Sequence, residues 1–289
     1  MVIDSTGGGK DVIAEVDYPS AALTLYEGAI YLVQASPWQV ERLDWVGRKA
    51  YVTRTAADYY TDAIDYSKLK ILAQFDQRAT GSGCCAHGEV HLLRHVAGYK
   101  KIRYYTHENV GYGPVNLPDQ EMHTMAVWWQ VDPAALEEAL PDRWRALEGF
   151  LGAAHALHIV AAVASLAERH DFGRAIGDAS GEWHATVAPD GRGQLKGQSG
   201  APIEPAALGS FCPAVFLYDN APGGTGLAAP LFDLSAVVPQ RALDLVANCA
   251  CRLGCPSCVG PISPHSDVGL DSPKQNALGV LRLIAGQVS

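Results

Sequence analysis

Four cysteines lie within one short stretch of the sequence, CACRLGCPSC, at positions 249, 251, 255 and 258. Cys249 and Cys251 are separated by one residue and Cys255 and Cys258 by two, so each pair can hold a metal ion in a small chelate ring. Gly254 permits the tight turn that brings the third sulfur back toward the first two. The pattern predicts tetrahedral ligation of one Zn²⁺ ion by four thiolates, with metal binding coupled to proton release and folding.

Such a zinc site would be structural, because four thiolates leave no coordination position for water or a substrate. Three other interpretations stay open at this level. A four-iron cluster also takes four cysteines. The segment from Cys255 to Cys258 resembles a redox-active CxxC pair, although the two upstream cysteines disfavour that use. The third interpretation is a loop of four unligated thiols.

The remaining residues that could do chemistry form weaker patterns. His155 and His158 are three residues apart in a predicted helix, a spacing that can chelate a metal, but no carboxylate accompanies them and histidines satisfied in a core are favoured. Asp219 ends a predicted strand, where it could be catalytic or, more commonly, cap a turn. Cys84 and Cys85 are adjacent, so both sulfurs seldom bind one metal. The sequence contains neither a nucleophile elbow nor an HExxH motif.

Two further segments could contact nucleic acid. Residues 94–107 interleave basic and aromatic side chains, which suits the phosphates and bases of a single strand, although a solvated strand face explains the same pattern. The segment NAPGGTG (220–226) links a strand to a helix, where free backbone N–H groups would attract a phosphate, unless the glycines only serve a tight connection. The predicted nucleic-acid contacts are Arg94, Lys100, Lys101, Arg103, Tyr104, Tyr105, Gly223, Gly224 and Thr225.

The composition limits these functions. The chain of 289 residues has a formal net charge of −9, which confines any contact with nucleic acid to a local basic patch. Its 48% hydrophobic and 18% charged residues are those of a globular protein. No run is expected to approach the roughly 18 apolar residues of a spanning helix, and the first residues form no signal region. We therefore expect a cytoplasmic protein without membrane contact, and the clustered cysteines suit a reducing compartment.

Hydrophobic periodicity divides the chain into three parts. Residues 1–20 are polar and glycine-rich and read as a tail or linker, in which STGGGKD lacks the spacer and the Ser or Thr of a phosphate loop. Residues 21–131 alternate with period two, which predicts a β-rich antiparallel sheet or small barrel. Residues 132–289 are expected to form a mainly helical zinc-binding domain that contains a strand, a PGG loop and a helix. The predicted fold class is therefore α+β.

Local patterns predict the individual elements. Asp132 and Pro133 start one helix, a long apolar helix follows over 146–169, and the segment from Asp271 to Pro273 caps a last helix over 274–286. Segments 106–121 and 191–200 are read as loops because they are rich in glycine. Strands are expected at 29–34, 39–46, 49–56, 69–75, 89–106 (with a turn or bulge at Gly98), 124–131, 182–188 and 214–219.

Three segments together resemble a known family. They are GAIYLVQ…QVERLDWVGRKAYVTRTAADYYTDA, GYKKIRYYTHENVGYGPVNLPDQEMHTMAVWW and FLYDNAPGGTGL…CACRLGCPSCVGP. Over residues 20–289 the chain is similar to the C-terminal region of the MrfA-type (mitomycin repair factor A) DNA helicases of superfamily two. That region carries the MrfA zinc-binding domain, formerly a domain of unknown function. The resemblance implies that Cys249, Cys251, Cys255 and Cys258 bind zinc.

The resemblance also implies a function for a parent protein. Such helicases use ATP, move 3′ to 5′ and repair DNA damage, including mitomycin lesions, and this region would pack on the RecA-like motor and help guide single-stranded DNA. The motor's phosphate loop, DEAH-like box and arginine-bearing motif do not occur in this sequence. We therefore expect a fragment or separate subunit that neither hydrolyses ATP nor unwinds DNA alone. The alternatives are a module that binds only protein, which the acidic charge favours, and an independent thiol oxidoreductase or hydrolase.

Overall fold

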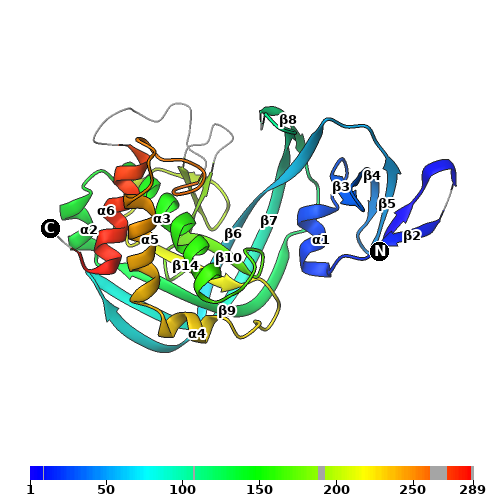
Figure 1. Ribbon diagram of the computed structural model, residues 1–289. Coiled ribbons are helices and arrows are strands. Elements are labelled where there is room, and N and C mark those ends of the chain that lie inside the picture. The colour runs from blue at the N-terminus through cyan, green and yellow to red at the C-terminus, as the bar shows by residue number, and fades with distance from the viewer. Residues whose placement is uncertain (9, 107, 188–192, 261–271, 288–289) are drawn as a thin grey trace. The chain divides into compact units, whose positions relative to one another are not determined.

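A computed structural model gives the fold of the chain (Figure 1). It describes residues 1–8, 10–106, 108–187, 193–260 and 272–287.

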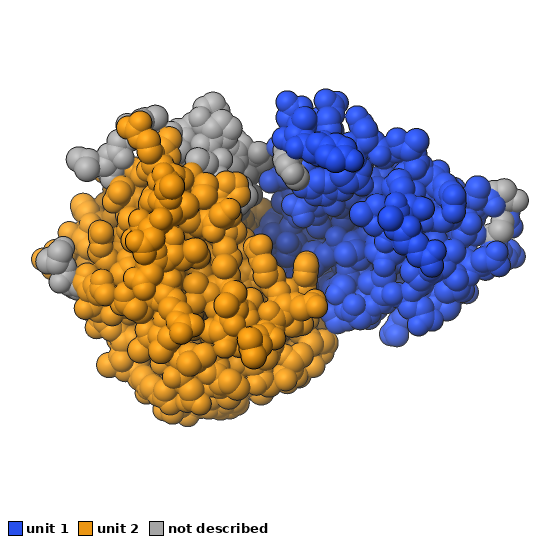
Figure 2. Space-filling model, viewed as in Figure 1, with its two compact units in different colours: residues 1–66, 94–120 blue, residues 67–93, 121–289 orange. Residues whose placement is uncertain are grey.

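The chain forms two compact units, and neither is continuous in sequence (Figure 2). Unit 1 contains residues 1–66 and 94–120, and unit 2 contains residues 67–93 and 121–289. Two long strands, β6 (Tyr59–Thr80) and β7 (Gly83–Arg103), each have one end in each unit. The division therefore differs from the predicted boundary between residues 131 and 132. A period-two pattern identifies a strand but does not say where along it the buried face passes from one core to another.

Unit 1 is built on a five-stranded sheet with the order β2-β1-β5-β4-β3. Neighbouring strands are antiparallel except β1 and β5, which are parallel. The core contains Tyr26, Trp38, Val52 and Tyr99. The elements are β1 (Val2–Asp4), β2 (Asp11–Ala14), α1 (Tyr18–Thr24), β3 (Ile30–Val33), β4 (Ser36–Asp44) and β5 (Lys49–Arg54).

Two sequence predictions for unit 1 are wrong. Residues 1–20 are not only a tail, because β1 pairs with β5 and the side chain of Val2 is fully buried. Residues 106–121 contain a strand, β8 (Asn109–Pro114), which pairs with β7. Gly113 is needed there, because a Cβ atom at this position would lie 2.3 Å from the ring of Tyr99. A glycine that makes room for an aromatic ring across a sheet looks, in sequence, like a loop glycine.

Unit 2 contains most of a nine-stranded sheet with the order β13-β12-β11-β10-β14-β9-β7-β6, to which β8 is added beside β7. Its core strands β9 and β14 are antiparallel. The α+β prediction is therefore confirmed. The strands not yet named are β9 (Gln120–Val131), β10 (Phe172–Gly177), β11 (Trp183–Val187), β12 (Gly193–Gly197), β13 (Pro202–Ile203) and β14 (Ala214–Asp219).

Unit 2 has more strands than the periodicity predicted, since β12 lies where a glycine-rich loop was expected. Gly193 begins this strand at a close approach to the central helix, and a Cβ atom there would lie 2.8 Å from Leu151 Cδ1. The glycines of this segment thus serve close packing, which composition alone does not distinguish from a flexible loop.

Helices cover the sheet of unit 2, and α3, α5 and α6 pack against one another (Figure 1). The central helix, α3, contacts β10 and β14 and begins after Asp142, whose Oδ1 accepts a hydrogen bond of 2.8 Å from the Trp144 N–H. The predicted cap at Asp132 is confirmed, with Oδ1 accepting from Ala134 and Ala135. The helices are α2 (Pro133–Ala139), α3 (Arg143–Ala164), α4 (Ala228–Asp233), α5 (Val237–Ala247) and α6 (Pro273–Ala285).

The helix α3 is long and apolar enough to cross a membrane, contrary to the sequence-based expectation, but 72% of its most apolar window is buried inside the protein. Its composition follows from this packing. Gly149 and Gly152 face α6, and a Cβ atom at Gly152 would lie 2.8 Å from the Cβ of Ala277. The small residues therefore let two core helices approach closely.

Candidate metal centre

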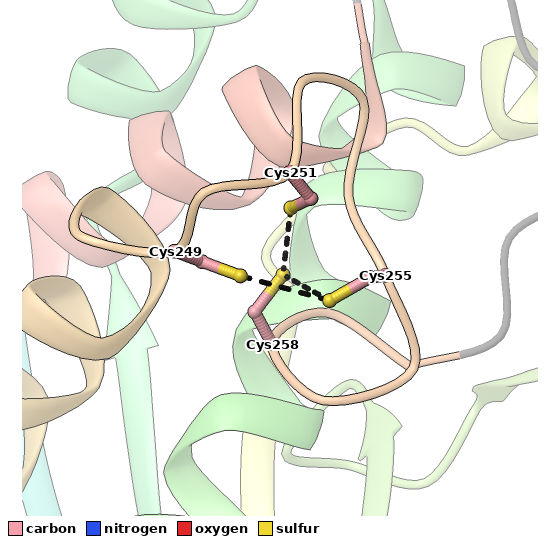
Figure 3. Close-up of side chains that lie close together, drawn as sticks. All are labelled: Cys249, Cys251, Cys255 and Cys258. Atoms are coloured by element: carbon pink, nitrogen blue, oxygen red, sulfur yellow. Dashed lines mark hydrogen bonds between the residues drawn. The ribbon is translucent and has the colours of Figure 1, made fainter.

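The four cysteine side chains converge in unit 2, in the loop between α5 and α6 (Figure 3). The Sγ atoms of Cys249 and Cys255 are 3.6 Å apart, those of Cys251 and Cys258 are 3.5 Å apart, and those of Cys255 and Cys258 are 3.6 Å apart. All four lie within 4.8 Å of one another. A tetrahedral Zn²⁺ site with Zn–S bonds of about 2.3 Å places its sulfurs ~3.8 Å apart. The observed spacing therefore fits four ligands of one ion.

This spacing also bears on two of the interpretations that the sequence left open, an iron cluster and an oxidised Cys255–Cys258 pair. A disulfide needs a sulfur–sulfur distance of about 2.05 Å, well below the 3.6 Å between Cys255 and Cys258. In a four-iron cluster each thiolate binds a different iron atom, so the sulfurs lie farther apart than on a single ion. The arrangement fits one tetrahedral ion better than either alternative.

The cysteine loop (residues 249–260) takes its shape from backbone geometry. Gly254 has a φ of 120°, which glycine tolerates far better than other residues, so the expected turn before Cys255 is present. The Cys258 N–H donates to the Cys255 carbonyl at 3.0 Å and closes a second turn. Val259 follows and packs beside Gly152 of α3. The loop therefore returns all four sulfurs to one point while its end is packed against the central helix.

A lysine holds the loop from the side of α6. Lys274 Nζ donates to the carbonyls of Cys249 at 2.6 Å and Cys251 at 3.0 Å, and its backbone N–H donates to Leu253 at 3.0 Å. Only 7% of the residue is exposed. Lys274 was not predicted from the sequence. A lysine in the first turn of a helix is disfavoured by the helix dipole, so its presence there is a sign that its ammonium group has another partner.

A histidine holds the loop from the side of α3. Burial lowers the pKa of His155 to about 4, so the imidazole is neutral at pH 7, and Nε2 is placed 2.8 Å from the Pro256 carbonyl to donate a hydrogen bond. His158 instead lies 3.0 Å from the Arg169 carbonyl and 3.1 Å from that of Phe172. The two histidines therefore do not chelate a metal together, and both belong to the core as expected.

The thiols differ in how readily they ionise without a metal. The backbone N–H of Cys251 lowers the pKa of Cys249 to about 7, whereas burial raises the pKa of Cys258 to about 12. A divalent cation would replace the protons, and four thiolates around it would leave an excess of negative charge. The ammonium group of Lys274 is the nearby cation that offsets this charge through the loop carbonyls. The arrangement can hold a metal, and its ligand set leaves no position for a substrate.

The glycine loop before α4 does not offer the free N–H groups that its sequence suggested. Gly223 donates to the His123 carbonyl at 2.8 Å, Gly224 to Ala221 at 3.0 Å, and Thr225 to Asp219 Oδ2 at 2.7 Å. The chain's own acceptors thus occupy the donors predicted for a phosphate. This pairing disfavours the predicted contact of Gly223, Gly224 and Thr225 with DNA through these N–H groups.

Asp219 caps a turn, which is the more common of the two roles that the sequence suggested. Its carboxylate is fully buried, and Oδ2 also accepts from the N–H groups of Gly226 at 3.0 Å and Leu227 at 3.2 Å. The carboxylate therefore caps the turn that leads into α4. A buried carboxylate already bound by three N–H groups is a poor general base, which disfavours the hydrolase alternative.

The basic and aromatic residues predicted to contact DNA occupy different environments in unit 1. Arg94 is only 3% exposed and forms an ion pair with Asp65 at 3.6 Å, which disfavours its predicted role as a DNA contact. Lys100 and Lys101 are consecutive in β7 and therefore point to opposite faces of the strand. Lys101 Nζ lies 5.2 Å from the ring centroid of Tyr59.

The strand end, its turn and β8 form a tyrosine hairpin (residues 99–106 and 108–114). Arg103 forms ion pairs with Asp58 at 3.5 Å and with Glu108 at 3.6 Å, so its charge is locally balanced. The rings of Tyr104 and Tyr105 are 6.5 Å apart at the turn. The described part of the hairpin therefore combines tyrosine rings with an arginine whose charge is matched by acids.

Comparisons with known proteins place the cysteine loop in a characterised domain. Residues 153–259 match the sequence model of the MrfA Zn-binding domain. The chain is 34% identical over 251 residues to an uncharacterized ATP-dependent helicase, YprA, of Bacillus subtilis (strain 168). The aligned region covers 86% of this chain and 29% of that helicase.

Solved structures give the same relationship. A crystal structure of DUF1998 helicase MrfA is similar with a TM-score of 0.57 and 28% identity, over 90% of this chain and 32% of that one. The same helicase bound to DNA is similar with a TM-score of 0.52 and 28% identity, over 98% of this chain and 33% of that one. The chain thus spans about a third of the length of the relatives it matches.

Proposed function

We propose that this chain, which carries an MrfA Zn-binding domain over residues 153–259, is the structural-zinc accessory region of an ATP-dependent DNA helicase. The parent protein would move 3′ to 5′ and act in DNA repair, including the repair of mitomycin-type damage. The accessory region would pack on the RecA-like motor domains and help guide single-stranded DNA. Neither ATP hydrolysis nor unwinding is assigned to this chain by itself.

The observation that carries the proposal is the position of the four thiols. They converge at distances suited to one Zn²⁺ ion and lie within the residues that match a zinc-binding domain. When bound, Zn²⁺ would join the end of α5 to the start of α6 through Cys249, Cys251, Cys255 and Cys258. Lys274 and His155 would keep the loop seated on α6 and α3. The chemistry of the ion is therefore architectural, since it stabilises a surface without taking part in a reaction.

Metal analysis of the purified chain tests the zinc assignment. We expect one Zn²⁺ ion per chain and a colourless protein, because zinc thiolates do not absorb visible light whereas iron–sulfur clusters are brown. A brown protein that contains iron would show that the cysteines hold an iron–sulfur cluster and not zinc. Protein purified without chelators that contains no stoichiometric metal would overturn the structural-zinc role, and the Cys255–Cys258 thiol oxidoreductase would then be the next function to test.

The motor partnership is supported by length and by the relatives. About two thirds of each matched helicase lies outside the region that this chain covers, so an accessory region must have a larger partner in those proteins. A binding titration between this chain and a separately produced motor fragment of the B. subtilis relative checks the idea. We expect saturable binding that persists when ATP is omitted. No association at micromolar concentrations would count against packing on the motor.

The DNA role is supported by the DNA-bound relative and by the exposed residues of the tyrosine hairpin. We expect weak binding of single-stranded DNA that declines with salt, as phosphate contacts do. The variant Lys100→Glu/Lys101→Glu should bind several-fold more weakly, whereas Lys10→Glu/Lys70→Glu, with the same change in charge at two exposed positions elsewhere, should bind as the parent does. Equal losses in both variants would indicate only a general charge effect. Motor binding without any DNA affinity would select the protein-only module.

A further inference from the structure

The tip of the tyrosine hairpin holds Tyr105 in an unusual backbone conformation. Its φ is 68°, in the left-handed region. The Thr106 N–H donates to the Tyr104 carbonyl at 2.8 Å, which closes a three-residue turn around Tyr105. A γ-turn with positive φ at its centre is rare and strained, because the Cβ atom approaches the following backbone. Glycine would adopt this turn at lower cost, so the tyrosine side chain needs another explanation.

Packing does not provide that explanation. Tyr105 is 97% exposed, so its ring gains almost nothing from burial in the described chain. Strained residues with bulky side chains persist where the surrounding structure over-determines them, and they concentrate at ligand-binding sites. A strained backbone that presents an aromatic ring to solvent is therefore a candidate binding feature.

The surroundings of the turn keep the ring in place. The Tyr104 N–H donates to the Asp58 carbonyl at 3.0 Å, and the Arg103 N–H donates to the Glu108 carbonyl at 2.9 Å. Ion pairs from Arg103 to Asp58 and Glu108 reinforce both contacts. The turn is thus held at its base from two sides, while the side chain of Tyr105 stays outside it. Such preorganisation lowers the entropy lost when a ligand binds.

The neighbouring side chains indicate the kind of ligand. The ring of Tyr104 lies between those of Tyr60 at 5.8 Å and Tyr105 at 6.5 Å, so Tyr105 ends a short series of aromatic rings. The acids beside Arg103 disfavour a phosphate at the tip but do not affect stacking of a neutral base. The exposed residues nearest to Tyr105 in sequence, Arg103 and Thr106, are polar, whereas the other large exposed apolar side chains of the hairpin, Val110 and Tyr112, lie in β8.

We propose that Tyr105 is a stacking site for one unpaired base of single-stranded DNA. The identity of the ligand rests on the DNA role in the proposed function, whereas the need for a ligand rests on the strain and exposure of the ring. Every base has an aromatic face, so the site would bind without sequence preference. Phosphates would contact cations other than Arg103, such as Lys100 and Lys101, and Tyr105 would add a contribution that depends little on salt.

The variant Tyr105→Gly tests this role because glycine keeps the turn and removes the ring. A single-stranded oligothymidylate of about 16 nucleotides, carrying one 2-aminopurine, reports stacking through fluorescence quenching. We expect Tyr105→Gly to bind roughly fivefold to hundredfold more weakly and to quench less. Its melting temperature should be equal to or higher than that of the parent, since the strain is relieved. Tyr105→Phe, which keeps the ring, should bind as the parent does.

Phe75→Ala provides the control, because Phe75 is a 57% exposed aromatic residue outside the hairpin, and it should bind DNA normally. Equal affinities for the parent and Tyr105→Gly would overturn the stacking site while leaving the DNA role intact. The absence of any oligonucleotide binding by the parent would overturn both. Weak binding by Tyr105→Phe would also contradict stacking, because it would assign the effect to the hydroxyl group.

Discussion

The cysteine loop and the tyrosine hairpin both contain turns with positive φ, but the first brings side chains together and the second exposes one to solvent. In the loop the positive φ angles belong to glycines, Gly254 and Gly260, whereas in the hairpin the residue is Tyr105. The loop turns its reactive groups toward one another, and helices α3 and α6 bind its carbonyls through His155 and Lys274. The hairpin presents the ring of Tyr105 to solvent and pairs Arg103 with Asp58 and Glu108.

This difference is expected between a site that stabilises the fold and a site that binds a ligand. Side chains that converge and are enclosed contribute to stability, so changes there should affect folding first. Side chains that diverge and are exposed contribute little to stability, so changes there should affect binding first. Variants at the two sites test this distinction.

The largest effect is expected when one metal ligand is lost. Cys258→Ser should abolish stoichiometric zinc and lower the unfolding free energy of unit 2 by at least several kcal/mol, since structural zinc contributes about 10 to 16 kcal/mol in small domains. Metal analysis combined with chemical denaturation measures both. Cys84→Ser, which changes a thiol outside the cluster, is the control and should retain the metal. If Cys258→Ser unfolds like the parent, the loop is not a structural clasp.

The next effect concerns the lysine that holds the loop. Lys274→Met keeps the aliphatic stem but leaves the carbonyls of Cys249 and Cys251 without their donor, which should cost about 2–4 kcal/mol. The rate at which a chelator removes zinc should rise as the loop loosens. Lys70→Met, at an exposed position, should change neither quantity. Unchanged zinc release in Lys274→Met would show that the cysteines alone hold the loop.

A smaller, graded effect is expected from pH. Burial lowers the pKa of His158 from 6.5 to about 4, so the unfolded chain binds a proton more readily than the folded one. The stabilisation is complete above about pH 6.5 and is lost as the pH falls toward 4, at up to about 1.4 kcal/mol per pH unit. Denaturation at several pH values should give a shallower slope for His158→Gln. Metal content must be measured at each pH, so that zinc release is not mistaken for this titration.

The smallest effect on stability is expected at the hairpin. Glu108→Ala removes an exposed partner of Arg103 and should change the unfolding free energy by less than about 1 kcal/mol. Single-stranded DNA should bind slightly more tightly, because the backbone hydrogen bond from Arg103 to the carbonyl of residue 108 still holds the turn while a negative charge beside the strand is lost. Thermal denaturation and a DNA titration at low salt measure the two changes. A large loss of stability would mean that the hairpin, like the cysteine loop, is part of the scaffold.

Some features of the molecule could be predicted from short segments. The cap at Asp132, the turn at Gly254 and the buried strand ending at Asp219 all follow from residues within a few positions of one another. Other features depended on distant partners. The glycines of β8 and β12 were read as loop residues because the side chains that need their space, Tyr99 and Leu151, lie elsewhere in the sequence.

Spacing along the chain identifies the four candidate metal ligands, because chelation by CxC and CxxC pairs depends on residues close together in sequence. The surroundings of these cysteines, and the charged groups that remain available to a ligand, depend on the tertiary structure. It buried Arg94 beside Asp65 and directed the N–H of Thr225 to Asp219. It also brought Lys274 to the cysteine loop and left Tyr105 exposed. Spacing is a local property, whereas burial and pairing depend on contacts between residues far apart in sequence, and those contacts exist only once the chain has folded.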